Sequence, residues 1–192
     1  EAKIDFSGKI IFSKIIRANI RSVARLTYLS VQKYIDSKER TLPIINNLVF
    51  AYNILRKKSL KRGKIDLDID DFKIVKSKNS NKFEFAKIEK IMSMSLVEEF
   101  MIFANNIVAT FLNKKKIKTL YRNHNIPTEE KLFKLINTLK EIKVSYTFKL
   151  KATQKDFLNL LELSAHPEFK LIKEMVLRVQ SKAYYHFDNI GH

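Results

Sequence analysis

The chain has 192 residues, 45% of them hydrophobic, and its 37 basic residues outnumber 20 acidic ones for a net charge of +17. That composition can bury the core of one domain or a large part of one, and the charge is typical of proteins that bind polyanions such as nucleic acids. The absence of cysteine excludes disulfides and thiolate zinc sites and fits a reducing cytoplasm.

The beginning of the chain predicts strands and then helices. The stretches KIDF and KIIFSKIIRANI predict a hairpin in which a two-residue Ser7–Gly8 turn joins a short strand to a long one. ARLTYLSVQKYI predicts entry into a helix capped by Thr27 or Ser30. Apolar spacing then predicts a helix over 42–62, with proline in its first turn and glycine after its basic end.

The segment GKIDLDIDDF concentrates four aspartates, Asp66, Asp68, Asp70 and Asp71. Clustered carboxylates are what a magnesium-dependent phosphodiester hydrolase needs, because hard divalent cations take oxygen ligands. Leu67 and Ile69 alternate with the aspartates, however, which is the pattern of a half-buried strand. The stretch by itself favours the strand and leaves the metal site as an alternative.

The remainder of the chain is mainly helical in pattern. NSNKFEFAKI predicts a polar turn and a short strand, and a long helix is expected over roughly 87–112. After the loop YRNHNIP, Thr128 opens a helix to about residue 142, Thr153 with Asp156 forms a capping box for another, and Pro167 begins the last. The fold class is therefore α+β, with strands first, and no domain boundary stands out.

No apolar run is expected to cross a membrane. The most apolar stretch, over 95–112, is interrupted by two glutamates and two asparagines, and the amino terminus lacks the order of a signal peptide. The sequence begins without methionine inside a strand-like alternation and stops at NIGH. We expect a cytoplasmic, monomeric piece of a longer protein, without a membrane partner.

Five segments in a fixed order resemble a known family. They are ARLTY at 24–28, LRKKSLKRGKIDLDIDDFKI at 55–74, LVEEFMIFANNIVA at 96–109, YRNHNIP at 121–127 and SKAYYHFDNIGH at 181–192. Together they resemble the later part of the catalytic domain, the RNB domain, of the RNase II and ribonuclease R family, and ribonuclease R more closely. One departure is Met94, where ribonuclease R proteins often carry histidine.

The resemblance implies a processive, hydrolytic 3′-to-5′ exoribonuclease that degrades single-stranded RNA to nucleoside 5′-monophosphates with Mg²⁺. In the family the metal-binding aspartates lie before the ARLTY element, so the DLDIDD stretch is expected to be structural and the catalytic cluster to lie upstream. The chain alone is then expected to bind no metal and to be inactive. The alternative is a non-catalytic RNA-binding or assembly module that retains the same fold.

The resemblance also points to substrate-binding residues. The residues alone favour a packed tyrosine with a satisfied hydroxyl at Tyr28. The resemblance reverses this preference and implies that Tyr28 lies near the 3′ end of the RNA. Glu98 shares a helix face with Asn105, and Glu99 lies at the edge of the apolar arc formed by Leu96, Phe100, Phe103, Ile107 and Phe111. One of the two glutamates is expected to contact the ribose, and the face shared with Asn105 favours Glu98.

The YRNHNIP loop adds two candidates. Arg122 offers a bidentate fork to phosphate. His124 can brace the loop by hydrogen bonding, which is favoured over catalysis because metal-activated hydrolysis needs no histidine base.

Overall fold

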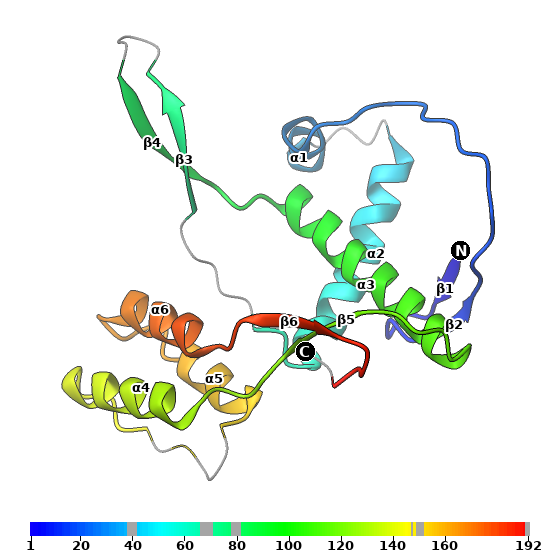
Figure 1. The fold of residues 1–192 in the computed structure, drawn as a ribbon. Helices are drawn as coiled ribbons and strands as arrows, with labels where there is room; N and C mark the ends of the chain where they lie inside the picture. Colours follow the sequence, from blue (N-terminus) through cyan, green and yellow to red (C-terminus); the bar gives the residue numbers. More distant parts are fainter. Residues whose placement is uncertain (38–41, 66–70, 78–81, 147, 149–151, 191–192) are drawn as a thin grey trace. The chain divides into compact units, whose positions relative to one another are not determined.

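The computed structural model describes the chain apart from residues 38–41, 66–70, 78–81, 147, 149–151 and 191–192 (Figure 1). The elements in chain order are β1 (Ala2–Ile4), β2 (Ile10–Ser13), α1 (Tyr28–Asp36), α2 (Pro43–Lys61), β3 (Asp71–Lys76), β4 (Phe83–Ile88), α3 (Met92–Lys114), β5 (Tyr121–His124), α4 (Glu129–Glu141), α5 (Gln154–Leu161), α6 (Phe169–Val179) and β6 (Ala183–His186). The predicted α+β class is confirmed.

The chain divides into two compact units. Unit 1 comprises Glu1–Arg62 and Asp70–Lys115, and unit 2 comprises Gly63–Ile69 and Lys116–His192. Among the described residues, the strands form two-stranded antiparallel sheets in which β1 pairs with β2, β3 with β4 and β5 with β6.

The hairpin of β1 and β2 in unit 1 is confirmed, but its turn is longer than two residues. Ile4 pairs with Ile10, and the Asp5 carboxylate accepts hydrogen bonds from the Ser7 amide at 2.8 Å and the Lys9 amide at 2.9 Å. Gly8 adopts a φ of 77°, which glycine reaches without strain. The predicted long second strand is wrong: β2 ends at Ser13, Lys14 still exchanges backbone hydrogen bonds of 2.9 Å with Glu1, and the chain then forms no strand before α1.

The first two helices of unit 1 begin where the sequence predicts. The Thr27 side chain accepts a hydrogen bond from the Ser30 amide at 3.1 Å, and the Ser30 hydroxyl oxygen accepts one from the Thr27 amide at 3.0 Å. The two bonds form a capping box at the start of α1. Helix α2 carries Pro43 in its first turn and is followed by Gly63 at a φ of 96°.

Helix α3 begins five residues later than predicted, because β4 extends through residue 88 and the chain leaves the strand before it turns helical. It packs on α2 and α1. The expected apolar arc is only partly confirmed: Leu96 is buried, Phe100, Phe103 and Ile107 are half-buried, and Phe111 is exposed. By length and composition alone, α3 is apolar enough to be a candidate membrane span, contrary to the expectation from the sequence.

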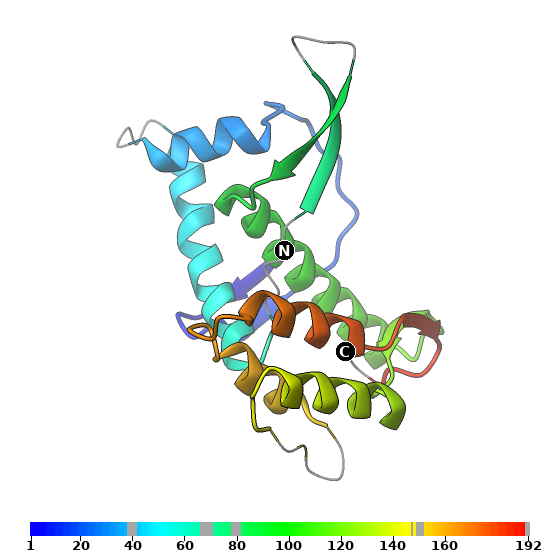
Figure 2. The same cartoon turned by 90° about the vertical axis from the view of Figure 1, so that its left-hand side faces the viewer.

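The described part of unit 2 is mainly helical. Helices α4, α5 and α6 pack around a core whose buried members are Leu135, Leu139, Val144, Phe157, Leu160, Ile172, Val176 and Val179 (Figures 1 and 2). The predicted starts of α4 and α5 are confirmed: Thr128 and Thr153 each accept a hydrogen bond from the third residue of the helix they cap. Helix α6 begins at Phe169, two residues after the predicted Pro167. Glu168 directly precedes α6.

The YRNH segment is a strand and not the loop that the sequence predicts. Tyr121–His124 forms β5, which pairs residue by residue with β6 at 183–186. The pairing partner lies some sixty residues further along the chain, so no local pattern reveals it. The predicted strand over Asp66, Asp68 and Asp70 lies outside the described residues, and Asp71 is the first residue of β3.

Candidate nucleic-acid interface

Helices α1 and α3 of unit 1 hold the backbone of Tyr28 in place. The Ser93 hydroxyl donates to the Tyr28 carbonyl oxygen at 2.9 Å, and the Ser93 amide donates to Gln32 Oε1 at 3.0 Å. Ser93 is buried, whereas the Tyr28 side chain is 47% exposed. The first turn of α1 is therefore fixed on the first turn of α3, with an accessible tyrosine at the junction.

Glu99 is a buried carboxylate of unit 1. It is only 2% exposed, and it accepts a hydrogen bond from the Ser59 hydroxyl at 2.7 Å. Arg56, one turn earlier on α2, approaches the other carboxylate oxygen at 3.4 Å. A buried charge needs such partners, because without them its transfer from water would be strongly unfavourable. The ion pair thus ties α2 to α3.

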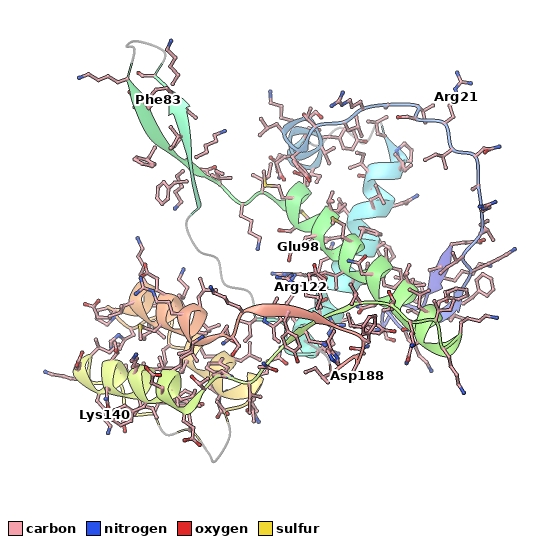
Figure 3. The ribbon with its side chains drawn as sticks, viewed as in Figure 1. Arg21, Phe83, Glu98, Arg122, Lys140 and Asp188 are labelled. Carbon is pink, nitrogen blue, oxygen red and sulfur yellow. The ribbon has the colours of Figure 1, made fainter. Side chains whose placement is uncertain are left out.

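Glu98 lies on a different side of α3. It is half-buried, and Asn105, two turns further along, is exposed. Figure 3 labels Glu98 on α3. The two glutamates therefore differ in access: one carboxylate is enclosed by protein groups, and the other lies within reach of solvent.

The β5–β6 strand pair of unit 2 presents Arg122. Arg122, which Figure 3 labels, is exposed. Its cross-strand partner is Tyr185, which is 67% exposed. Residues directly opposite in an antiparallel pair project from the same face with their Cβ atoms about 5 Å apart. A guanidinium and a phenol ring are thus neighbours on one face, a combination that suits a phosphate and a base.

His124 and Asn123 attach the same strand to the end of the chain. The Nδ1 atom of His124 lies 2.9 Å from the Ser181 carbonyl oxygen, which agrees with the expected bracing role. Asn123 is fully buried, and its Nδ2 donates to the Asp188 carbonyl oxygen at 2.7 Å. These contacts fix the position of β5, and with it the position of Arg122.

The sequence-predicted residues fall into two sets. Tyr28, Glu98, Glu99 and Asn105 belong to unit 1, where Ser93 connects the Tyr28 backbone to the helix that carries the other three. Arg122 and His124 belong to unit 2. Sequence reasoning missed Arg56, Ser59, Ser93 and Tyr185.

A local signal existed for the two serines. Ser59 follows Tyr52 and Leu55 at helical spacing, and Ser93 precedes Leu96 and Glu99 at intervals of three. A polar residue on a buried stripe requires a hydrogen-bond partner, so both positions could have been singled out. Tyr185 had no such signal, because its proximity to Arg122 depends on the pairing of two distant strands.

Within the part of the chain that the structure describes, no group of three or more histidine, aspartate or glutamate side chains could hold a metal ion. Asp66, Asp68 and Asp70 lie outside the described residues.

The whole chain matches the model of one protein family. The RNB domain model covers residues 1–192, and the chain therefore belongs to the RNB domain family. Its relatives include ribonuclease R of Mycoplasmopsis pulmonis, at 31% identity over 98% of this chain and 27% of that protein. Ribonuclease R of Thermotoga maritima is 28% identical over 100% of this chain and 28% of its own length.

A solved structure agrees with the sequence relatives. Mycoplasma genitalium RNase R in complex with ribose-methylated single-stranded RNA superposes with a TM-score of 0.87 at 26% identity, over 100% of this chain and 31% of that one. The resemblance to the ribonuclease R family is thus confirmed, and the chain spans less than a third of the length of these relatives.

Proposed function

We propose that the chain forms part of the catalytic domain of a hydrolytic, processive 3′-to-5′ exoribonuclease that acts on single-stranded RNA and releases nucleoside 5′-monophosphates. The observation that carries the proposal is the similarity over the entire chain to an RNase R that binds single-stranded RNA. The excess of 37 basic over 20 acidic residues supports the same partner, because the RNA backbone attracts positive charge.

Tyr28 and one of Glu98 and Glu99 read the terminal ribose in this proposal. A phenol hydroxyl and a carboxylate can share the 2′-hydroxyl, which is both a donor and an acceptor and distinguishes RNA from DNA. Ser93 supports this role, because it fixes the Tyr28 backbone on α3, the helix of both glutamates. Glu98 is the more accessible carboxylate, which favours contact with RNA, and Glu99 is held by Ser59, which favours a fixed orientation.

Arg122 contacts a phosphate in this proposal, and Tyr185 beside it stacks on a base. A guanidinium matches the geometry of phosphate oxygens, and an aromatic ring stacks on any base, so neither contact depends on the sequence of the RNA. His124 acts as a positioning residue, because its contact with Ser181 orients the strand that carries Arg122.

Magnesium belongs to the proposal for the longer enzyme, whose metal-binding aspartates are expected to lie upstream of this chain. In such an enzyme the metal would activate water at the scissile phosphate. The contribution of this chain is to bind and orient the RNA. We further propose a cytoplasmic, monomeric enzyme without a membrane partner.

The test is the ratio of kcat/KM for RNA to kcat/KM for DNA of the same sequence, measured on the full-length protein that carries the chain. A site built to hydrogen-bond a hydroxyl disfavours the analogue without it, because its own polar groups are left unpaired. We therefore expect Tyr28→Phe to lower the ratio while RNA cleavage stays measurable. We expect the same of either Glu98→Ala or Glu99→Ala, whichever removes the carboxylate that contacts the ribose.

The matched control is Tyr146→Phe, which removes a hydroxyl that hydrogen-bonds to Asp156 in the helical part of unit 2 and should leave the ratio unchanged. An unchanged ratio in all three test variants, with folding intact, would show that these side chains are structural. RNA binding without release of monophosphates by the unmodified full-length protein would favour the non-catalytic binding module.

A further inference from the structure

The β3–β4 hairpin presents one face made entirely of exposed side chains. In the antiparallel register Phe72 faces Lys87, Ile74 faces Phe85 and Lys76 faces Phe83. Directly opposed residues share a face of the sheet, so these six residues form a single surface, which we call the aromatic face. Figure 3 labels Phe83 on this hairpin.

The apolar members of the aromatic face are unusually accessible. Phe72 is 53% exposed, Ile74 66%, Phe83 74% and Phe85 78%. The opposite face behaves differently, because its apolar residues Val75, Ala86 and Ile88 are half-buried. The larger side chains of the hairpin are thus the ones left in water, and contiguous exposed apolar surface of this kind marks a binding site.

The charges on the aromatic face indicate what binds there. Lys76 lies beside Phe83 near one end of the ladder and Lys87 beside Phe72 near the other, and the six positions include no acidic residue. The acidic side chain of β4, Glu84, stands opposite Val75 on the other face. Lysines that flank aromatic rings on a sheet match a single strand of nucleic acid, whose bases stack on the rings while its phosphates meet the ammonium groups.

We propose that the aromatic face of the β3–β4 hairpin is a stacking platform for single-stranded RNA, separate from the ribose-reading residues on α1 and α3. The inference rests on the RNA partner of the proposed function and adds a second contact surface to it. Phe83 and Phe85 stack on bases, and Lys76 and Lys87 neutralise the phosphates beside them. Duplex RNA lacks the unstacked bases that the rings require, so it is not the ligand of this surface.

The experiment measures binding of the 192-residue chain to fluorescently labelled oligoadenylate of about eight nucleotides, a length typical for such platforms. Phe85→Val removes the ring and Phe85→Tyr keeps it, and both replacements are strand formers, so the hairpin is retained in each. Phe85→Val should weaken binding about tenfold and Phe85→Tyr should not, because stacking of one base contributes an affinity change of that order.

Two controls identify the surface and the type of contact. Phe133→Val replaces a phenylalanine of α4 that is 64% exposed and should leave single-strand binding unchanged. Binding of an RNA duplex of the same length should be equal in the unmodified chain and in Phe85→Val, since that contact is electrostatic.

The outcomes separate this inference from the proposed function. If the unmodified chain binds oligoadenylate and Phe85→Val binds equally well, the platform is refuted while the RNA partner stands. The same conclusion follows if Phe85→Val alters only thermal stability or self-association, which would assign the aromatic face to a protein contact. If the unmodified chain binds no RNA, the platform is refuted, and the proposed function is decided by the RNA-to-DNA ratio of the full-length protein.

Discussion

The hydrogen bond between Ser59 and Glu99 allows a quantitative test of how unit 1 is held together. Ser59→Ala removes a hydroxyl that donates at 2.7 Å to a carboxylate with 2% exposure. Hydrogen bonds to charged groups contribute about 1.5–3 kcal/mol, and the acceptor here is left buried when its donor is lost. Arg56 remains 3.4 Å from the other carboxylate oxygen and is itself 22% exposed, so part of the charge stays compensated. We expect Ser59→Ala to lower the free energy of unfolding by about 2 kcal/mol.

Glu99→Ala removes the carboxylate itself and should cost more. Breaking a buried ion pair costs about 3–5 kcal/mol, and the partial exposure of Arg56 places the expected loss near the lower limit, at about 3 kcal/mol. The double variant Ser59→Ala/Glu99→Ala should lose clearly less than the sum of the two single losses, because both changes delete the same contact.

The assay is urea denaturation of the 192-residue chain, monitored by circular dichroism. Because the two compact units can unfold separately, amide hydrogen exchange of α2 and α3 measures the stability of unit 1 by itself. Asn53→Ala on the exposed side of α2 is the matched control and should stay within about 0.5 kcal/mol of the unmodified chain. A loss below about 0.5 kcal/mol for Ser59→Ala, or strict additivity in the double variant, would refute the reasoning.

Four other predictions concern RNA, metal and pH. The chain alone, given magnesium and single-stranded RNA, should release no nucleotides, and steady release that survives ion exchange and is absent from a mock preparation would contradict this. The affinity of the chain for RNA should fall steeply between about 50 and about 200 mM salt, because counterion release dominates the contacts of a chain with a net charge of +17. An affinity that does not change with salt would show that the positive charge does not hold the RNA. In the full-length protein, Asp66→Asn with Asp68→Asn should leave the cleavage rate within about tenfold, whereas a collapse with intact folding would restore the metal site. The hydrogen bonds from the Ser7 hydroxyl and the Lys9 amide lower the pKa of the Asp5 carboxyl from its ordinary 3.8. The β1–β2 turn should therefore keep its full stability above pH 3.8 and lose it as the pH falls through the lowered pKa. The chemical shift of the Ser7 amide measures this titration, which should disappear in Asp5→Asn.

Features that depend on neighbouring residues could be predicted from the sequence. The capping residues Thr27, Thr128 and Thr153 predict the starts of α1, α4 and α5. The signal is local, because a capping side chain accepts a hydrogen bond from an amide only three residues further along the chain. Pro43 and Gly63 mark α2 in the same way, through backbone angles that each residue sets locally. The family, too, was recognisable from short motifs in a fixed order, since motifs are strings of neighbours.

Contacts between residues that are distant in the sequence could not be predicted from it and were found only in the tertiary structure. The YRNH segment is a strand only because residues 183–186 pair with it, and that pairing places Tyr185 beside Arg122. Burial likewise separates Glu98 from Glu99, which are adjacent in sequence: α2 supplies Ser59 and Arg56 to one carboxylate and leaves the other near solvent. The sequence by itself determined the residue types, the helix starts and the family, because these are local. Partners and exposure were decided by the packing of helices and strands, because hydrogen bonds and burial depend on distances in space that separation along the chain does not set.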